Sequence, residues 1–243
     1  KYYLFILLFF SFNSLSAMDK KPYHHIYKDG KLHAFRNLEG GPKRDPNFKW
    51  DWKVFREEKK KLKIDYPPEH VIDRQIVLKN LEKHKSDSYV MWLDHASFII
   101  KLGDTTIITD PVFEKYYGYL GFGTKKFIEP PLKLKELPEI NLFLLTHNHL
   151  DHHSQKTINN FPYKNTKVLV PLKLGKYFTR NGYKKDNVKE MDWFDKIKIN
   201  DEITVTMLPS QHWSKRWIWG DGNTNRSLWG SFLIEYKDKK IFF

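Results

Sequence analysis

The sequence predicts an α/β fold in which the faces of two β-sheets pack together beneath outer helices. Short apolar runs of strand length alternate with segments of helical pattern along most of the 243 residues. Apolar residues make up 40% of the chain, which is enough for a substantial core in one large domain or two small ones. Paired apolar runs near residues 89–109 and 231–243 add hairpins at the start and end of this arrangement.

The first 17 residues have the pattern of a secretory signal peptide. Lys1 precedes a short apolar stretch, and small residues lead to Ala17, as at a cleavage site. The apolar stretch is short for a membrane span, and an uncleaved membrane anchor is the alternative interpretation. We therefore expect an exported protein, periplasmic or secreted, or one held at the membrane by this segment.

Residues 18–88 are expected to form a polar N-terminal arm that wraps the core. Glycine and proline pairs interrupt this stretch, and helical patterns favour helices near residues 52–62 and 69–84. The adjacent His24 and His25 lie in the arm and are expected to be solvated.

The core domain is expected to span residues 89–243. Gly103-Asp104 separates two strand-like runs and favours a hairpin turn. The final run ends the sequence without a turn or polar tail, so we expect a sandwich that is incomplete at its C-terminus. The pattern predicts strands at residues 89–93, 97–102, 105–109, 140–145, 167–170, 188–191, 196–199, 203–208, 231–236 and 240–243, and helices at 155–160 and 172–181.

The composition excludes some classes of function. The absence of cysteine excludes disulfides, lipoprotein anchoring and thiolate metal ligands. The net charge is +13, but the lysines are spread along the chain and alternate with acids. This pattern is typical of a solvated basic surface and does not indicate nucleic-acid binding. Attraction to anionic lipid headgroups is a second interpretation of the charge.

The most informative motif is the histidine loop, His147-Asn148-His149-Leu150-Asp151-His152-His153, which follows an apolar run. His147 and His149 would point to the same side of an extended backbone and could hold one metal ion. Asp151 and His152, our candidate catalytic residues, could reach a second ion, as in two-metal hydrolases. With nitrogen and oxygen donors only, zinc is favoured, followed by manganese or iron. His153 should diverge from its neighbour and is not expected to bind metal.

Three further positions could contribute to the site. His212 follows the predicted strand at 203–208 and could supply the third ligand of the first ion. Asp110 also follows a strand, and it could either orient a ligand imidazole or cap the turn before Pro111. His95 lies between strands and could face the site, although a lone histidine in a turn more often packs or meets solvent.

Tryptophans dominate the segment after His212. Trp213, Trp217 and Trp219 alternate with basic residues, and this combination favours the boundary between water and lipid. They could therefore contact a lipid or substrate, with core packing as the alternative.

From Tyr89 to Phe243 the sequence resembles the metallo-β-lactamase superfamily and, within it, the branch of N-acyl-phosphatidylethanolamine-hydrolysing phospholipases D. The histidine loop alone indicates only the superfamily, whereas Ser210-Gln211-His212-Trp213 and Leu228-Trp229-Gly230-Ser231 are more specific. Further similar blocks are Trp92-Leu93-Asp94-His95-Ala96-Ser97, Thr109-Asp110-Pro111-Val112-Phe113, Gly123-Thr124-Lys125-Lys126-Phe127 and Met191-Asp192-Trp193-Phe194.

The resemblance implies an αββα sandwich with two zinc ions. The family's bridging aspartate and its last histidine ligand would follow Phe243. Asp94 departs from the glycine that is usual in the family, and this could alter the loop that carries His95. The implied ligands are His147, His149 and His212 for one ion and Asp151 and His152 for the other.

The implied function is that of a zinc-dependent phosphodiesterase of the phospholipase D type, which hydrolyses N-acyl-phosphatidylethanolamine to N-acylethanolamine and phosphatidate. A phospholipid substrate and peripheral contact with an anionic membrane are expected with it. Two alternatives stay open: a general hydrolase of this fold acting on lactones or other esters, and a non-catalytic exported lipid-binding protein. We expect residues 18–243 alone to bind at most one zinc ion, to cleave no phosphodiester and to be poorly soluble.

Overall fold

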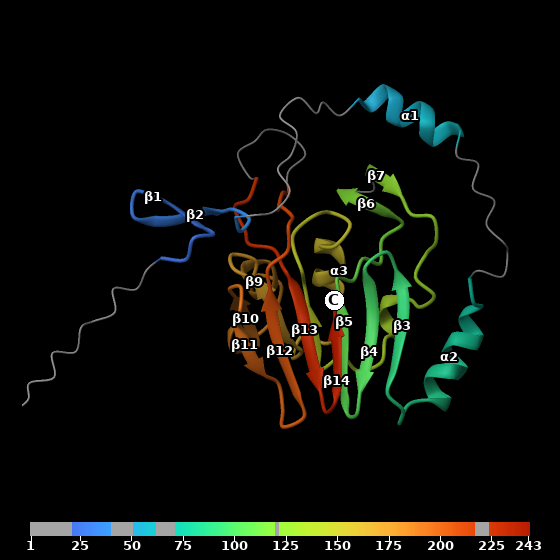
Figure 1. Cartoon of the computed structure of the whole chain (residues 1–243). Helices are drawn as coiled ribbons and strands as arrows, with labels where there is room; N and C mark the ends of the chain where they lie inside the picture. Colours follow the sequence, from blue (N-terminus) through green and yellow to red (C-terminus); the bar gives the residue numbers. More distant parts are fainter. Residues whose placement is uncertain (1–20, 40–50, 62–70, 120–121, 217–223) are drawn as a thin grey trace, which may run out of the picture.

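The computed structural model describes residues 21–39, 51–61, 71–119, 122–216 and 224–243 and shows two β-sheets stacked face to face (Figure 1). The α/β sandwich predicted from the sequence is confirmed. The expected signal segment, residues 1–17, lies outside the described residues. No helix in the described ranges has both the length and the apolar character to span a membrane.

The larger sheet has six strands in the order β10-β9-β8-β5-β4-β3. Strands β3 to β5 pair antiparallel, whereas β5, β8, β9 and β10 run parallel. The inner parallel strands are buried almost throughout because both faces of the sheet are covered. The bounds are β3 (Tyr89–Asp94), β4 (Ser97–Leu102), β5 (Thr105–Thr109), β8 (Leu142–Leu144), β9 (Lys167–Pro171) and β10 (Val188–Met191).

The smaller sheet is antiparallel, in the order β11-β12-β13-β14. Alternate residues of β12 are buried, as expected for a strand with one face on the core. Its Val205 and Met207 pack with Leu142 and Leu144 of the larger sheet in the core between the two layers. The bounds are β11 (Lys196–Lys198), β12 (Ile203–Leu208), β13 (Ser231–Tyr236) and β14 (Lys239–Phe242).

Helices cover the outer face of the larger sheet. A second core forms there, where Phe143 of β8 meets Phe161 and Phe178 edge to face. Phe161 directly follows α3, and α3 begins at Ser154, whose side chain accepts a hydrogen bond from a backbone N–H in the first turn. The helices of this layer are α2 (Arg74–Lys83), α3 (Gln155–Asn160) and α4 (Lys176–Thr179), and α1 (Trp52–Lys61) precedes them in the arm.

Most of the predicted strands agree with the structure to within one or two residues, but two helices are shorter than predicted. The helix expected at 172–181 is limited to α4, because Lys173 has a left-handed backbone with φ of 72° and interrupts the helical pattern. The helix expected at 69–84 begins only after Asp73, whose side chain caps it.

Two hairpins of the structure were not predicted. Strands β1 (His25–Lys28) and β2 (Lys31–Phe35) form a hairpin in the arm, and β6 (Tyr116–Tyr119) and β7 (Phe122–Lys125) form another. The turn of the first hairpin is Asp29-Gly30, a strong local turn signal in which both residues have positive φ.

The arm packs on the core, and the prediction that its adjacent histidines are solvated is wrong. Phe35 is fully buried in the core between the sheets. His24 Nε2 lies 2.6 Å from one carboxylate oxygen of Asp192, and His25 Nε2 lies 2.8 Å from the other. The His24 ring also stacks on Trp193. The two imidazoles therefore fasten the arm to the end of β10, a contact between segments that are distant in sequence.

Gly230 tests how tightly the chain is packed against β12 just before β13 begins. A Cβ atom at this position would lie 2.7 Å from the carbonyl oxygen of Leu208 and 2.7 Å from Cε of Met207. The carbonyl belongs to a paired strand and cannot easily withdraw. We expect Gly230→Ala to lower the free energy of unfolding by about 2 kcal/mol, as for overpacking in a core.

Gly182→Ala is the control, because nothing lies within 4 Å of its added methyl group and only the left-handed backbone, with φ of 86°, opposes the change. We expect this control to cost about 1 kcal/mol. Denaturant unfolding measures both variants, and a smaller loss for Gly230→Ala than for Gly182→Ala would contradict the steric argument.

Candidate metal centre

Two parallel strands bring the polar loops of the site together. Strand β8 leads into the histidine loop, and the neighbouring β5 ends just before Asp110. The backbone N–H of Asp110 donates to the carbonyl oxygen of Leu144, and that of Gly230 donates to the carbonyl oxygen of Thr146. The loop thus starts at the carboxyl edge of the parallel strands, where open α/β sheets commonly bind ligands.

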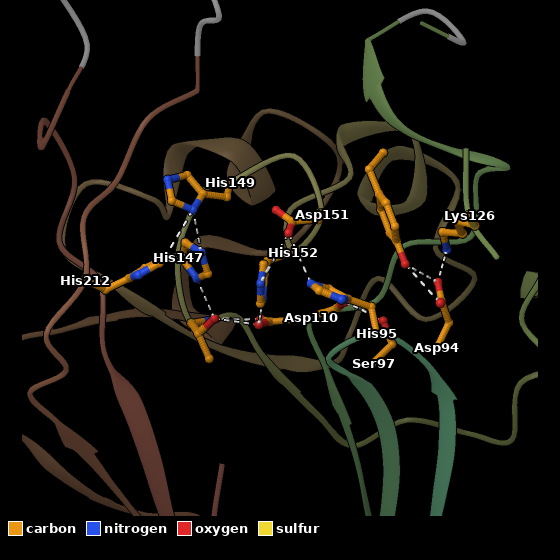
Figure 2. Close-up of polar contacts among 12 residues, drawn as sticks. Asp94, His95, Ser97, Asp110, Lys126, His147, His149, Asp151, His152 and His212 are labelled. Carbon is orange, nitrogen blue, oxygen red and sulfur yellow. Dashed lines mark hydrogen bonds and ion pairs between the residues drawn. The ribbon is translucent and has the colours of Figure 1, made fainter. Parts of the chain in front are cut away.

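Three ring nitrogens converge at the first cluster, which consists of His147, His149 and His212 (Figure 2). His147 Nε2 lies 2.9 Å from His149 Nδ1. His212 Nε2 lies 3.1 Å from His147 Nε2 and 3.2 Å from His149 Nδ1. Three such contacts cannot all be hydrogen bonds, because each ring nitrogen either carries a proton and donates or lacks one and accepts, so at least two of the three nitrogens have the same role. A metal ion bound by all three nitrogens accounts for this geometry, so these residues fit a metal site.

The second cluster consists of His95, Asp151 and His152. Asp151 Oδ2 lies 3.1 Å from His95 Nε2 and 3.8 Å from His152 Nε2. The ring of His152 is 4.1 Å from that of His147, so the two clusters are adjacent. The structure thus brings together all five metal ligands predicted from the sequence and adds His95 at the edge of the second cluster.

Asp110 lies beneath both clusters and is fully buried. Its carboxylate accepts from the backbone N–H of Thr146 at 2.8 Å, from the Thr146 hydroxyl, and from His152 Nδ1 at 2.7 Å. The contact with Nδ1 turns Nε2 of His152 towards Asp151, which is how a carboxylate orients a metal-binding imidazole. Of the two roles left open by the sequence, the geometry favours the orienting role.

Burial determines the protonation of the first cluster. Burial, together with the neighbouring imidazoles, lowers the pKa of His147 far below the usual range and that of His149 to about 4. Burial also lowers the pKa of His212. All three rings are therefore neutral at neutral pH, which is the form that binds metal.

The second cluster contains opposed effects. Burial alone would raise the pKa of Asp151, but the hydrogen bond from His95 and the nearby His152 bring that pKa below its usual range. Burial alone would lower the pKa of His152, but the hydrogen bond with Asp110 raises it. Asp151 thus offers an ionised carboxylate as a metal ligand. His152 keeps a proton on Nδ1, the nitrogen that faces Asp110.

The remaining predicted site residues lie outside the clusters. Trp213 is 46% exposed, and its ring packs edge to face on His149 with centroids 4.2 Å apart. Trp217 and Trp219 lie outside the described residues. His153 is buried against Tyr177 and belongs to neither cluster.

A buried ion pair beside the second cluster was missed by the sequence analysis. Asp94 lies 2.5 Å from Lys126 Nζ and accepts from the Tyr117 hydroxyl at 2.8 and 2.9 Å. The next residue, His95, has a left-handed backbone with φ of 45°. The aspartate at the position where the family usually has glycine therefore has a buried cationic partner, and the two lie next to the loop that carries His95. The unusual Asp94 was the one signal in the sequence.

Residues 105–243 match the family described as the β-lactamase superfamily domain, and the chain belongs to the metallo-β-lactamase superfamily of metal-dependent hydrolases. Within it, the chain is 31% identical to the mitochondrial N-acyl-phosphatidylethanolamine-hydrolyzing phospholipase D of Saccharomyces cerevisiae, over 67% of this chain and 34% of that protein. It is 28% identical to N-acyl-phosphatidylethanolamine-hydrolyzing phospholipase D 1 of Caenorhabditis elegans, over 65% of this chain and 46% of that protein. The chain thus spans between about a third and a half of these curated relatives.

Among solved structures, the chain is similar to CmlA, a diiron β-hydroxylase from Streptomyces venezuelae, with 26% identity and a TM-score of 0.45 over 65% of this chain and 29% of that chain. It is also similar to an isothiocyanate hydrolase from Delia radicum gut bacteria, with 16% identity and a TM-score of 0.49 over 63% of this chain and 60% of that chain.

We expect His147→Ala or His149→Ala in the full-length protein to lower the amount of metal bound per protein, because each removes one ring nitrogen from the first cluster. Elemental analysis of the purified protein measures the change. Two full equivalents in either variant would show that the cluster is not a metal site. His153→Ala is the matched control, since it should lower stability by opening a cavity beside Tyr177 but leave the metal content unchanged.

The metal-free protein should lose stability as the pH falls from about 6.5 towards 4. The pKa of His149 is about 4 in the folded protein and 6.5 as the ordinary value, so between these values only the unfolded chain takes up the proton. The share of this loss due to His149 is on the order of 2 kcal/mol once solvent screening of its partly exposed ring is allowed for. Denaturant unfolding in the presence of a chelator measures it, and an equally steep dependence in His149→Asn would rule out this residue as the cause.

Proposed function

We propose that this protein is a zinc-dependent phosphodiesterase of the phospholipase D type that hydrolyses N-acyl-phosphatidylethanolamine to N-acylethanolamine and phosphatidate. The observation that carries the proposal is the pair of adjacent donor clusters in a chain whose yeast and nematode relatives are named for this hydrolysis. The donors are imidazole nitrogens and carboxylate oxygens, which suit zinc.

The two clusters would bind and orient the phosphodiester between them. Bound zinc ions act as Lewis acids towards phosphoryl oxygens and make a water-derived nucleophile available near neutral pH. His147, His149 and His212 would hold one ion, and the ionised Asp151 with His152 would hold the other. Asp110 keeps the His152 ring in place by accepting a hydrogen bond from Nδ1 of that ring.

A cleft beside the second cluster supports a lipid substrate. Asp151 and His95 line one side of this cleft, which has a volume of about 600 Å³. Trp92 and Phe127 line another part and are 50% and 72% exposed. The polar side would face the phosphodiester, while the apolar side chains would contact acyl or glycerol carbons. The exposed Trp213 ring on His149 would add a contact on the first cluster.

The proposal includes peripheral contact with an anionic membrane, supported by the net charge of +13, and export directed by the N-terminal segment. Association with vesicles that contain anionic lipid, weakened by added salt, is the expected behaviour.

The assay uses the purified full-length protein and vesicles that contain N-acyl-phosphatidylethanolamine, with products measured by mass spectrometry. N-acylethanolamine and phosphatidate should form in equal amounts. Their formation should stop when a chelator removes the metal and resume when zinc is added. Turnover of lactones or other esters without release of phosphatidate would instead support a general hydrolase of this fold. Vesicle binding without turnover, retained in His147→Ala, would support a lipid-binding protein.

Asp110→Asn should weaken metal binding at the second cluster by about 10- to 100-fold, because the amide is a poorer acceptor for His152 Nδ1 and no longer holds the ring in place. Competition with a chromophoric chelator measures the affinity, and hydrolysis should fall in parallel. Asp201→Asn is the control, since Asp201 is an exposed partner of Lys198. Equal metal affinities in the two variants would contradict the orienting role.

A further inference from the structure

His212 reaches the first cluster from a segment that has left its sheet. Strand β12 ends at Leu208, and His212 follows four residues later without a paired strand beside it. The polar groups of its backbone therefore need other partners. Both partners come from the side chain of Asn37, which is 175 positions earlier in the sequence.

The amide of Asn37 makes two hydrogen bonds with the backbone of His212. Asn37 Nδ2 donates to the carbonyl oxygen of His212 at 2.8 Å, and the backbone N–H of His212 donates to Asn37 Oδ1 at 3.1 Å. A side-chain amide presents an N–H donor and a carbonyl oxygen side by side, as a residue of an antiparallel strand does, so it can replace a neighbouring strand at this point. A carboxylate at position 37 would place an oxygen against the His212 carbonyl and repel it.

In the part of the chain that the structure describes, the ring of His212 lacks the hydrogen bond on its second nitrogen that the rings of His147 and His152 have. Nδ1 of His147 contacts the hydroxyl of Thr146, and Nδ1 of His152 contacts Asp110. Within the described ranges, the hydrogen-bond contacts of the His212 ring are those of Nε2 with His147 and His149. The direction of the His212 side chain is thus set through its backbone, where Asn37 binds it.

Asn37 is itself held on a fixed support. The backbone N–H of Arg36 donates to the carbonyl oxygen of His24, and His24 is fastened to Asp192. Phe35 is fully buried, and its backbone N–H donates to the carbonyl oxygen of Asn225. The arm therefore carries Asn37 to His212 from a position that is bound to both the core and the segment after β12.

We propose that Asn37 is a positioning residue of the metal centre, which holds His212 in the orientation that completes the first cluster. The N-terminal arm is then a working part of the site. This inference rests on the proposed function only through the assignment of His212 as a metal ligand.

The test uses the purified full-length protein and measures its binding of zinc against a chromophoric competitor, together with the absorption spectrum of the Co²⁺-loaded form. Asn37→Asp should weaken the binding of one ion about tenfold or more, leave the other unchanged and shift the Co²⁺ spectrum. Asn37→Ala should weaken the binding of the same ion to a smaller extent, because it removes both hydrogen bonds without adding a repulsion.

Asn187→Asp is the matched control. Asn187 Nδ2 donates to the backbone carbonyl of Asn165 at 2.7 Å, so the control loses the same type of bond just before β10, at the opposite end of the parallel strands from the histidine loop. Its metal affinities and Co²⁺ spectrum should match those of the unchanged protein, whatever its melting temperature.

His212→Ala distinguishes the assignment of His212 as a metal ligand from the positioning role of Asn37. If it keeps both ions, the ligand assignment fails. If it loses one ion while Asn37→Asp and Asn37→Ala bind both ions as the unchanged protein does, the ligand assignment holds and the positioning role of Asn37 is wrong. A fall in stability with equal weakening of both ions would also overturn the positioning role. Should the aspartate variant fail to fold, the alanine variant carries the same comparison.

Discussion

The buried carboxylate of Asp110 is the group on which the arrangement of the site depends. A charge with no exposure to solvent is costly unless hydrogen bonds compensate it, and Asp110 obtains them from Thr146 and His152. These partners lie on the two sides of the histidine loop, one before it and one near its end. A single side chain thus holds the start of the loop against the sheet and sets the ring of a cluster residue.

The two clusters lie side by side but are built differently. The second cluster takes Asp151 and His152 from one short loop, and its orienting group Asp110 comes from the adjacent strand end. The first cluster needs His212, which arrives from the smaller sheet. Its geometry therefore depends on the packing between the sheets as well as on the loop. Burial keeps the three imidazoles of the first cluster neutral, which is the form that binds metal. In the second cluster, the carboxylate of Asp151 stays ionised because His95 and His152 lie beside it.

The sequence predicted the features that depend on local pattern. Strands such as β12 and β13 follow from alternating apolar residues, and the close spacing within the histidine loop was enough to place four candidate ligands. Contacts between distant segments left no such pattern. The local sequence around His24 and His25 indicates solvated residues. In the fold, both contact Asp192, which lies far along the chain. Lys173 ended a helical pattern because its backbone is left-handed, which periodicity does not reveal.

The pairing of Asn37 with His212 explains why the arm belongs to the site although its composition is polar and its pattern weak. Bringing together segments 175 positions apart costs conformational entropy, which two hydrogen bonds alone do not offset. Burial of Phe35 and the contact of His24 with Asp192 provide the additional stabilisation. The docking of the arm and the formation of the first cluster are therefore linked equilibria. A metal ion that binds the complete cluster more tightly than an incomplete one must also stabilise the docked arm.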